Sequence, residues 1–425
     1  MDNLIYAIHP LGEIMHAFPK NPIELKTYLI DPLYRNTFFI IITSISSAGF
    51  GFIFWMLAAR FYPQEDVGVA TALISSMGML ILLSKLGFDQ SIIRFFPTRD
   101  KSKVLGTAII VTSLFGFVLG ALFIATVDIW SPELHQVKDY APLYITFLIA
   151  NSVTAFIGAA FVALRKSEFY FLQSLLFGSR LLILIPLVFL GALGIFSSLG
   201  LSFVVALIVS VFLLYRFGIR LSGLDRDFLI DSFRFSAGNY FSGLLIAAPS
   251  TILPILVLNI LGAEKAAQYF IAYAIVMFLF LIPTSFTTSL FVEGSHGEAL
   301  KRNVLKSLAG IFALLIPAVL GLFIFGEYIL GLIGPDYVEG LELVKVLAIS
   351  SFFFSFSEVF IAIKKVQYGL KSLIVISAII FILLLGFSYA LMLQFGILGV
   401  GYAWILTYAL IGIVVVLSMA KRYVL

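Results

Sequence analysis

Two ionisable side chains stand deep inside long apolar stretches of the chain. Arg180 lies in FLQSLLFGSRLLILIPLVFL, and Glu358 lies in SSFFFSFSEVFIAIKK. The Arg guanidinium is a planar, permanently charged fork that binds the oxygens of anionic groups in pairs. A carboxylate in apolar surroundings can take up a proton, bind a cation or pair with an arginine. Arg180 is therefore the first candidate for anion binding, and Glu358 for ion coupling.

Further cations stand at the ends of apolar stretches. Arg35 and Arg234 each precede one such stretch, and Lys85, Asp89 and Arg94 follow another in SKLGFDQSIIRFF. Spacings of four and five predict that Lys85 and Asp89 share one face of a helix, with Arg94 within reach of it. Two interpretations stay open for these groups: they bind an anionic ligand, or they anchor helix ends at a membrane surface.

Prolines interrupt three of the apolar stretches, at Pro249 and Pro254, at Pro283 and at Pro317. A proline within a membrane helix removes a backbone hydrogen bond and bends the helix. Pro249 and Pro254 are candidates for a bend in a helix that lines a cavity or flexes. Static kinks are the alternative.

Several kinds of chemistry have no support in the sequence. The chain has no cysteine, and His9, His16, His135 and His296 lack the spacing of metal ligands. A phosphate-binding glycine loop and a Ser/His/Asp set in a plausible order are also missing. We therefore expect neither catalysis, nor a metal site, nor a cofactor.

Composition places the chain in a membrane. Of its 425 residues 61% are hydrophobic and 12% are charged, against about 45–50% and about 25% in soluble domains. Continuous apolar runs of about 18 or more residues predict helices and not the alternating strands of a barrel. The expected spans are 37–59, 68–88, 105–127, 142–164, 169–195, 199–215, 237–261, 267–290, 307–326, 346–363, 372–394 and 397–418.

The distribution of charge predicts the orientation. Alternate connections, together with both termini, hold 21 Lys and Arg residues, whereas the other connections hold four. The positive-inside rule places the first set in the cytoplasm, in a multi-pass protein of the cell membrane. The opening stretch MDNLIYAIHPLGEIMHAFPK lacks the basic start and apolar core of a signal peptide, so we expect a cytoplasmic tail. The net charge of +4 is an orientation signal and does not indicate nucleic-acid binding.

A single constant offset aligns landmarks in the two halves of the chain. The aligned positions are Arg35 with Arg234, Glu65 with Glu264, Lys103 with Arg302, Arg165-Lys166 with Lys364-Lys365, and Leu199-Gly200 with Leu398-Gly399. Since each half holds six spans, the halves share one orientation. We predict an all-α integral membrane protein of about twelve transmembrane helices, in two parallel, pseudo-symmetric six-helix bundles around a central cavity.

This organisation divides the chain into five parts. They are a cytoplasmic tail (1–36), an N-terminal lobe (37–217), a cytoplasmic linker (218–236), a C-terminal lobe (237–418) and a cytoplasmic C-terminus (419–425).

Three stretches resemble a known family. They are YPQEDVGVATALISSMGMLILLSKLGFDQSIIRFFP (62–97), FSAGNYFSGLLIAAPSTILPILVLNILGAEKAAQYFIAYAIVMFLFLIPTSFTTSLFVEGSHG (235–297) and FGILGVGYAW (395–404). They are similar to the polysaccharide flippase branch of the multidrug/oligosaccharidyl-lipid/polysaccharide exporter superfamily, and the resemblance covers the chain after about residue 30.

The resemblance implies a transporter that alternates access and moves an oligosaccharide carried on a polyprenyl phosphate or diphosphate. Candidates for binding the substrate phosphate are then Arg35, Arg234, Arg180, Lys85 and Arg94. Arg180 could instead pair with a neighbouring helix. Glu358 could bind a coupling proton or cation, or pair with Arg180, although from the helical rise it should lie about 10 Å closer to the cytoplasm. The resemblance also places the helices with Pro249 and Pro254 at the cavity, so their bend is a candidate for gating. Membrane lipids and other polysaccharide-assembly proteins are the further expected partners.

Three other functions stay open. A cation-coupled multidrug antiporter of the same superfamily would favour acidic over basic cavity groups. A glycosyltransferase or polymerase with polyprenyl donors would present acidic residues in a large outer loop, and the connections around 128–141 and 327–345 are short for that. The fourth possibility is a non-catalytic organiser of an assembly complex.

Overall fold

The computed structural model describes residues 32–295, 300–367 and 370–423, and within these residues every regular element is helical. Eleven stretches of the described chain are long and apolar enough to cross a membrane. A further helix, α16 (Leu398–Tyr423), is apolar over Leu398–Ile413. The prediction of an all-α membrane protein with about twelve spanning helices is confirmed.

The helices form two sets with the same order. The N-terminal lobe holds α3 (Pro32–Phe61), α4 (Gln64–Lys85), α5 (Phe88–Phe95), α6 (Lys101–Trp130), η2 (Pro132–Tyr140), α7 (Ala141–Ala163), α8 (Ser167–Phe177), α9 (Arg180–Leu184), η3 (Ile185–Leu190) and α10 (Ala192–Arg216). The C-terminal lobe holds α11 (Arg226–Leu261), α12 (Ala263–Ser295), α13 (Leu300–Ile333), η4 (Pro335–Gly340), α14 (Leu341–Val366), α15 (Leu370–Phe395) and α16. In both lobes a short 3-10 segment, η2 or η4, follows the third long helix.

The two lobes have the same order of long helices, but the residue offset between equivalent positions changes along the chain. The second long helix of each lobe begins at Gln64 and at Ala263, which obey the offset that relates Arg35 to Arg234. Before the last helix, however, Gly191 (φ 57°) and Gly396 (φ 58°) occupy equivalent turns at a larger separation. Gly194 and Gly399 follow, each pressed against the backbone of the preceding segment. The predicted equivalence of Leu199-Gly200 with Leu398-Gly399 is therefore wrong, because Gly194 is the counterpart of Gly399.

Two predicted spans have internal breaks. The second span ends at Lys85, because Leu86 (φ 51°) and Gly87 (φ 76°) turn the chain before α5 begins. The fifth span is divided into α8, α9 and η3. Pro186, which lacks an N–H, lies at the start of η3, where an α-helix would need that donor.

The seventh helix begins earlier than expected. Asp225 caps α11 by accepting a hydrogen bond from the backbone N–H of Phe228, so residues 226–236 are helical and belong to no linker. The connection between the lobes is the shorter segment 217–225. The boundary of the N-terminal tail also moves, since α3 begins at Pro32. Residues 1–31 and 424–425 lie outside the described part.

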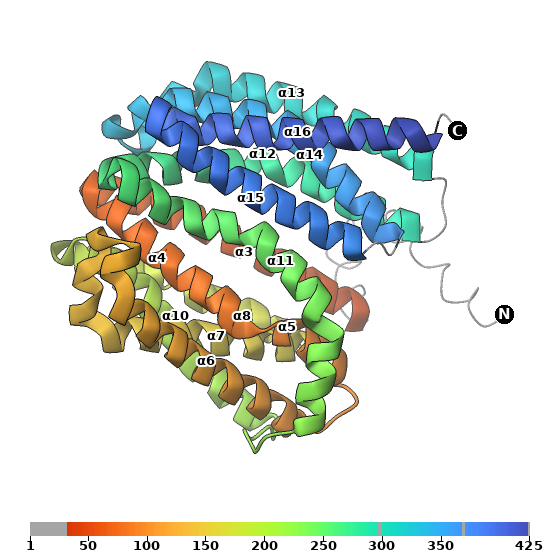
Figure 1. Ribbon diagram of the computed structural model, residues 1–425. Coiled ribbons are helices and arrows are strands. Elements are labelled where there is room, and N and C mark those ends of the chain that lie inside the picture. Colours follow the sequence, from red (N-terminus) through yellow and green to blue (C-terminus); the bar gives the residue numbers. More distant parts are fainter. Residues whose placement is uncertain (1–31, 296–299, 368–369, 424–425) are drawn as a thin grey trace, which may run out of the picture.

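Figure 1 shows α4 and α11 in the middle of the molecule, between α6, α7 and α10 on one side and α13, α14 and α16 on the other. The first turns of α11 run beside α5, and the helix then bends and crosses toward α15. Phe228 of α11 is fully buried and stacks on Phe88 of α5, with ring centroids 6.0 Å apart. The start of α11 therefore packs as part of the N-terminal lobe.

The two ends of the helices differ in charge. We call the end that carries the connections 96–100, 164–166 and 217–225 the basic end, and the end that carries η2, η4 and the α3–α4 connection the opposite end. The first residues of α3 and the last residues of α16 both lie toward the basic end (Figure 1).

Candidate functional site

Arg180 stands where the fifth span is broken. It is the first residue of α9, directly after the Gly178-Ser179 turn that ends α8. The break places its side chain against α3, where the guanidinium carbon lies 5.2 Å from the ring centroid of Phe54. A Cβ atom at Gly51 would lie 3.7 Å from Nη2 of Arg180. Arg180 thus occupies the space that a larger side chain at Gly51 would need.

The guanidinium of Arg180 can still donate hydrogen bonds to a ligand. Arg180 forms no ion pair with any described residue, and its buried Nε has no hydrogen-bond partner among them. A half-buried cation in an apolar span needs water, a partner or a ligand. Stacking on Phe54 is a contact with a neighbouring helix, as the structural alternative expects, but it leaves the charge of Arg180 without an acidic partner in the described chain. The arrangement can bind an anion.

An apolar cavity borders the same residue. It has a volume of about 320 Å³ and lies between α3 and α12. Its walls include Gly51, Phe52 and Trp55 of α3 and Phe270 and Phe278 of α12. Gly51 lines this cavity, and a Cβ atom built on it would lie 3.7 Å from the Arg180 guanidinium, so Gly51 is next to both. A cation and an apolar groove are therefore neighbours here.

Arg35 lies near the start of α3, where this helix packs against α8. Its Nη2 is 3.8 Å from Oε1 of Glu168, and the next residue, Asn36, accepts hydrogen bonds from the backbone N–H and the hydroxyl of Ser167. From the helical rise, Arg35 and Gly51 stand about 24 Å apart along α3. Arg35 is thus a partly neutralised cation at the basic end, at a distance from Arg180.

Arg234 differs from Arg35 in its surroundings. It lies beyond the second turn of α11, not in its first turn, and its side chain is exposed. The predicted equivalence of these two arginines as openings of two helices is wrong, because α11 begins at Arg226. Whether either of them binds substrate stays a prediction.

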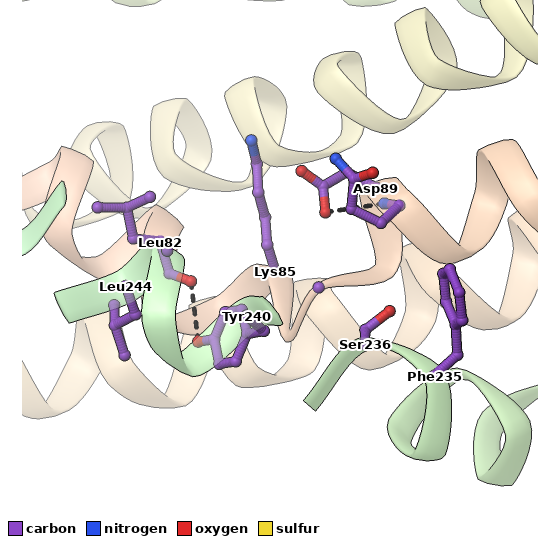
Figure 2. A pocket seen from close by; sticks show the side chains of 10 residues that line it. Leu82, Lys85, Asp89, Phe235, Ser236, Tyr240 and Leu244 are labelled. Carbon is purple, nitrogen blue, oxygen red and sulfur yellow. Dashed lines mark hydrogen bonds between the residues drawn. The ribbon is translucent and has the colours of Figure 1, made fainter. Parts of the chain in front are cut away.

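The predicted helical face with Lys85 and Asp89 does not form, because Lys85 ends α4 while Asp89 and Arg94 lie on α5. The turn at Leu86 and Gly87 separates Lys85 from α5, so the four-residue spacing to Asp89 does not run along one helix. Both side chains nevertheless line one cavity of about 390 Å³ (Figure 2). Arg94 does not line this cavity, but its guanidinium carbon lies 4.6 Å from the ring centroid of Phe235, which does.

Glu358 is half-buried in α14, in the C-terminal lobe. It forms no ion pair with a described residue, so the expected alternative of pairing with Arg180 is not realised. Two buried hydroxyls without hydrogen-bond partners among the described residues belong to Ser357, its neighbour in α14, and to Thr407 of α16. Such oxygens, together with the carboxylate, are groups that can bind a proton or a small cation.

Pro249 and Pro254 both lie inside α11, which stays helical from Arg226 to Leu261. Each proline deprives the carbonyl four residues earlier of its intrahelical donor. The bend that Figure 1 shows in α11 lies toward its start, beside α5. A gating role for the two prolines stays a prediction.

Sequence reasoning missed the residues that join the lobes at the opposite end. Arg60 Nη1 donates to the carbonyl of Leu332 (3.3 Å), and Gln64 Nε2 donates to that of Asp336 (3.3 Å). Asn259 Nδ2 donates to the carbonyl of Trp130 (2.6 Å). The partners are backbone carbonyls, which no residue pattern reveals. The one available signal was the constant offset between the halves, which also relates Arg60 to Asn259.

Comparison with known proteins gives both a family and a fold. A family model described as polysaccharide biosynthesis protein matches residues 33–291. A comparison with curated protein sequences finds no match.

Among solved structures, the chain is similar to an inward-facing multidrug resistance transporter of the MATE family of the MOP superfamily, with 14% identity and a TM-score of 0.72 over 88% of this chain and 94% of that one. An outward-facing MATE transporter gives 16% identity and a TM-score of 0.63 over 92% and 96%. A MATE transporter in the bent conformation gives 16% and 0.61 over 92% and 95%. At these identities the likeness shows the fold.

Proposed function

The chain belongs to the polysaccharide biosynthesis protein family, and we propose that it is a multi-pass membrane transporter of the MOP superfamily that flips an oligosaccharide carried on a polyprenyl phosphate or diphosphate. The basic end lies in the cytoplasm, by the positive-inside rule. The substrate enters there and leaves at the opposite end. The product serves the assembly of a cell-surface polysaccharide or glycan.

The observation that carries this proposal is the position of Gly51, which lines the apolar cavity and is next to Arg180. The substrate joins an anionic phosphate to a hydrocarbon chain, and the site joins an unpaired guanidinium to a groove lined by Phe52, Trp55 and Phe270. A guanidinium binds phosphate oxygens by charge-assisted hydrogen bonds. The isoprenoid chain occupies the groove between α3 and α12, while the phosphate faces Arg180.

Hydrogen bonds join the lobes at both ends, but through different elements. At the opposite end α13 and η4 of one lobe bond to α3 and α4 of the other, through Arg60 and Gln64. At the basic end the hydrogen bonds between the lobes come from the first half of α11, as between Ser91 and Ser236. The bonds at the opposite end support a state closed at that end.

Glu358 supplies the coupling group in this proposal. Its carboxylate lies in the C-terminal lobe, away from Arg180 in the N-terminal lobe. Because the two groups do not neutralise one another, Glu358 can take up a proton or cation while Arg180 holds the phosphate. Downhill movement of that ion would then reset the transporter.

The test uses purified protein in liposomes that contain a labelled polyprenyl-diphosphate oligosaccharide. We expect labelled headgroup to become accessible on the far leaflet. Arg180→Ala should slow this by roughly tenfold or more, since a hydrogen bond to a charged group contributes about 1.5–3 kcal/mol. Arg180→Lys, which keeps the charge and loses the fork, should fall between the two.

The matched control is Arg216→Ala. Arg216 also lies over an aromatic ring, with its guanidinium carbon 5.7 Å from the centroid of Phe212, but it stands at the basic end of α10. Its removal should leave the flipping rate unchanged. Equal amounts of folded protein in the membrane must be shown for all variants. If Arg180→Ala flips as fast as the parent protein, the assigned site is wrong.

A multidrug antiporter is the second candidate function, favoured by Glu358 inside the C-terminal lobe and by a fold shared with multidrug transporters. The same liposomes separate the two functions. Export of a lipophilic cation without movement of the lipid-linked sugar would favour the antiporter and end the flippase proposal.

A further inference from the structure

A second cavity, of about 390 Å³, lies at the basic end between the α4–α5 turn and α11. Its size falls within the range of small-molecule pockets, roughly 300–1,000 Å³. One wall comes from the end of α4 and the start of α5, and the other comes from α11 (Figure 2). The cavity is distinct from the apolar groove between α3 and α12.

The frame of this cavity is held by hydrogen bonds and by close packing. The hydroxyl of Tyr240 donates to the carbonyls of Leu82 and Leu83, at 3.0 and 3.1 Å, which lie in the last turn of α4. A Cβ atom at Gly87 would stand 2.9 Å from Cβ of Ser236. The backbone of the turn thus rests directly on α11, and only glycine fits there.

The Tyr240 hydroxyl is occupied by these hydrogen bonds. Other polar groups and rings that line the cavity remain able to contact a ligand. The polar groups are the Lys85 ammonium, the Asp89 carboxylate and the Gln90 amide, and the rings are those of Phe235 and Tyr240. Asp89 Oδ1 accepts from the backbone N–H of Gln90 at 3.0 Å, so Oδ2 stays available. Figure 2 shows the ends of Lys85 and Asp89 near one another on one side of the turn.

The charges in the cavity select against an anionic ligand. Among the groups that line the cavity one ammonium and one carboxylate cancel, the Arg94 guanidinium is stacked on Phe235, and Asp89 would repel a phosphate brought to Lys85. A sugar fits better, because its hydroxyls can donate to the carboxylate and accept from the ammonium and the amide. Its C–H faces can pack on aromatic rings, whose faces carry partial negative charge.

We infer that this cavity binds sugar units of the transported lipid, with Asp89 and Gln90 as the residues that recognise their hydroxyls. The inference rests on the proposed function. It assigns the sugar headgroup to the α4–α5 turn and α11, and it leaves the phosphate to Arg180. Selection among substrates then depends on the polar groups of this cavity.

The experiment compares two lipids in the same liposomes: a polyprenyl diphosphate that carries an oligosaccharide, and the bare polyprenyl diphosphate. For Asp89→Asn and for Gln90→Ala we expect flipping of the sugar-bearing lipid to fall by tenfold or more. Flipping of the bare lipid should stay at the parent rate. Asp227→Asn is the matched control, because Asp227 is an exposed carboxylate on the first turn of α11, at the same end and outside the cavity.

The outcomes separate the two proposals. If the parent protein moves the sugar-bearing lipid and the Asp89 and Gln90 variants slow both lipids equally, the cavity does not recognise sugar, while the flippase function stands. Unchanged rates for both lipids would also overturn the sugar assignment alone. If the parent protein moves neither lipid, the flippase function fails and the sugar assignment fails with it.

Discussion

Arg60 and Asn259 each donate a hydrogen bond to a carbonyl at the C-terminal end of a helix in the other lobe. The two residues occupy corresponding positions in the two halves of the chain. Arg60 of α3 reaches Leu332, next to the last residue of α13. Asn259 of α11 reaches Trp130, the last residue of α6, and its Oδ1 accepts from the hydroxyl of Ser131 at 2.5 Å. Helix-terminal carbonyls lack intrahelical partners, so each contact satisfies an open acceptor.

Replacing Asn259 should weaken closure of the opposite end. Asn259→Ala removes two hydrogen bonds between the lobes and leaves the carbonyl of Trp130 to water. A net contribution of about 1 kcal/mol for each of the two bonds predicts a rise of roughly 30-fold in the population open at that end. The chain has no cysteine, so a single Thr71→Cys reports opening through its rate of modification by a membrane-impermeant maleimide. Thr71 is fully buried on α4, one turn beyond Gly68.

The control for this prediction is Arg60→Ala. Arg60 is exposed, and its single bond to Leu332 is longer, at 3.3 Å. Its removal should raise the Thr71→Cys labelling rate less than Asn259→Ala does. Equal labelling in the parent, Arg60→Ala and Asn259→Ala proteins would show that these contacts do not hold the opposite end closed.

Gly68 should set how closely the lobes approach at the same end. A Cβ atom at this position would overlap the backbone oxygen of Ala263, at the start of α12. Gly68→Ala must therefore push α4 and α12 apart, and we expect faster labelling of Thr71→Cys and slower transport. Gly49→Ala is the matched control, because a Cβ atom there meets nothing within 4 Å. Labelling that stays as slow in Gly68→Ala as in Gly49→Ala contradicts this prediction.

The sequence was sufficient for the membrane fold, because twelve apolar runs of bilayer length leave few alternatives. It was also sufficient to single out Arg180, since a charge in the middle of an apolar span is conspicuous. The breaks were harder to predict. The α4–α5 turn needs a positive φ at Leu86, which is not a glycine, and its position depends on packing against Tyr240 and Ser236.

The sequence could not predict the surroundings of the candidate residues. Arg35 and Arg234 look equivalent at a fixed offset, but the Asp225 cap starts α11 early and leaves Arg234 exposed. Arg180 and Glu358 belong to different halves of the sequence, and only the packing of the lobes shows that they form no ion pair. Contacts to backbone carbonyls follow from the arrangement of helices and carry no residue signature.

The two equivalent glycine turns should differ in stability. Gly191 has φ 57° and ψ −137°, and a Cβ atom there would lie 2.8 Å from Oδ1 of Asp66. That carboxylate accepts from the backbone N–H of Ala192 at 3.1 Å, so it cannot move without loss of a hydrogen bond. Gly396 has φ 58° and open space around it.

Both Gly191→Ala and Gly396→Ala put a side chain at a positive φ that L residues rarely adopt, at a cost of about 1–3 kcal/mol. Gly191→Ala adds the clash with Asp66, so its thermal unfolding temperature in detergent should fall further. A larger loss for Gly396→Ala would show that the contact with Asp66 does not decide the difference between the two turns.

Gly51 should act as the opening between the apolar groove and Arg180. A Cβ atom at Gly51 stands in ordinary contact with the guanidinium, at 3.7 Å, whereas the longer side chain of Gly51→Leu would fill the space between them. We expect Gly51→Leu to slow flipping of the sugar-bearing lipid by tenfold or more. Leucine favours a helix over glycine by up to about 1 kcal/mol, so the slower rate should not come with lower stability. Gly49→Leu, two positions earlier on α3 at an exposed site with open space, is the matched control. The measurement is the flipping rate in liposomes at equal protein content. If Gly51→Leu and Gly49→Leu flip the lipid at the same rate, the phosphate does not reach Arg180 past Gly51.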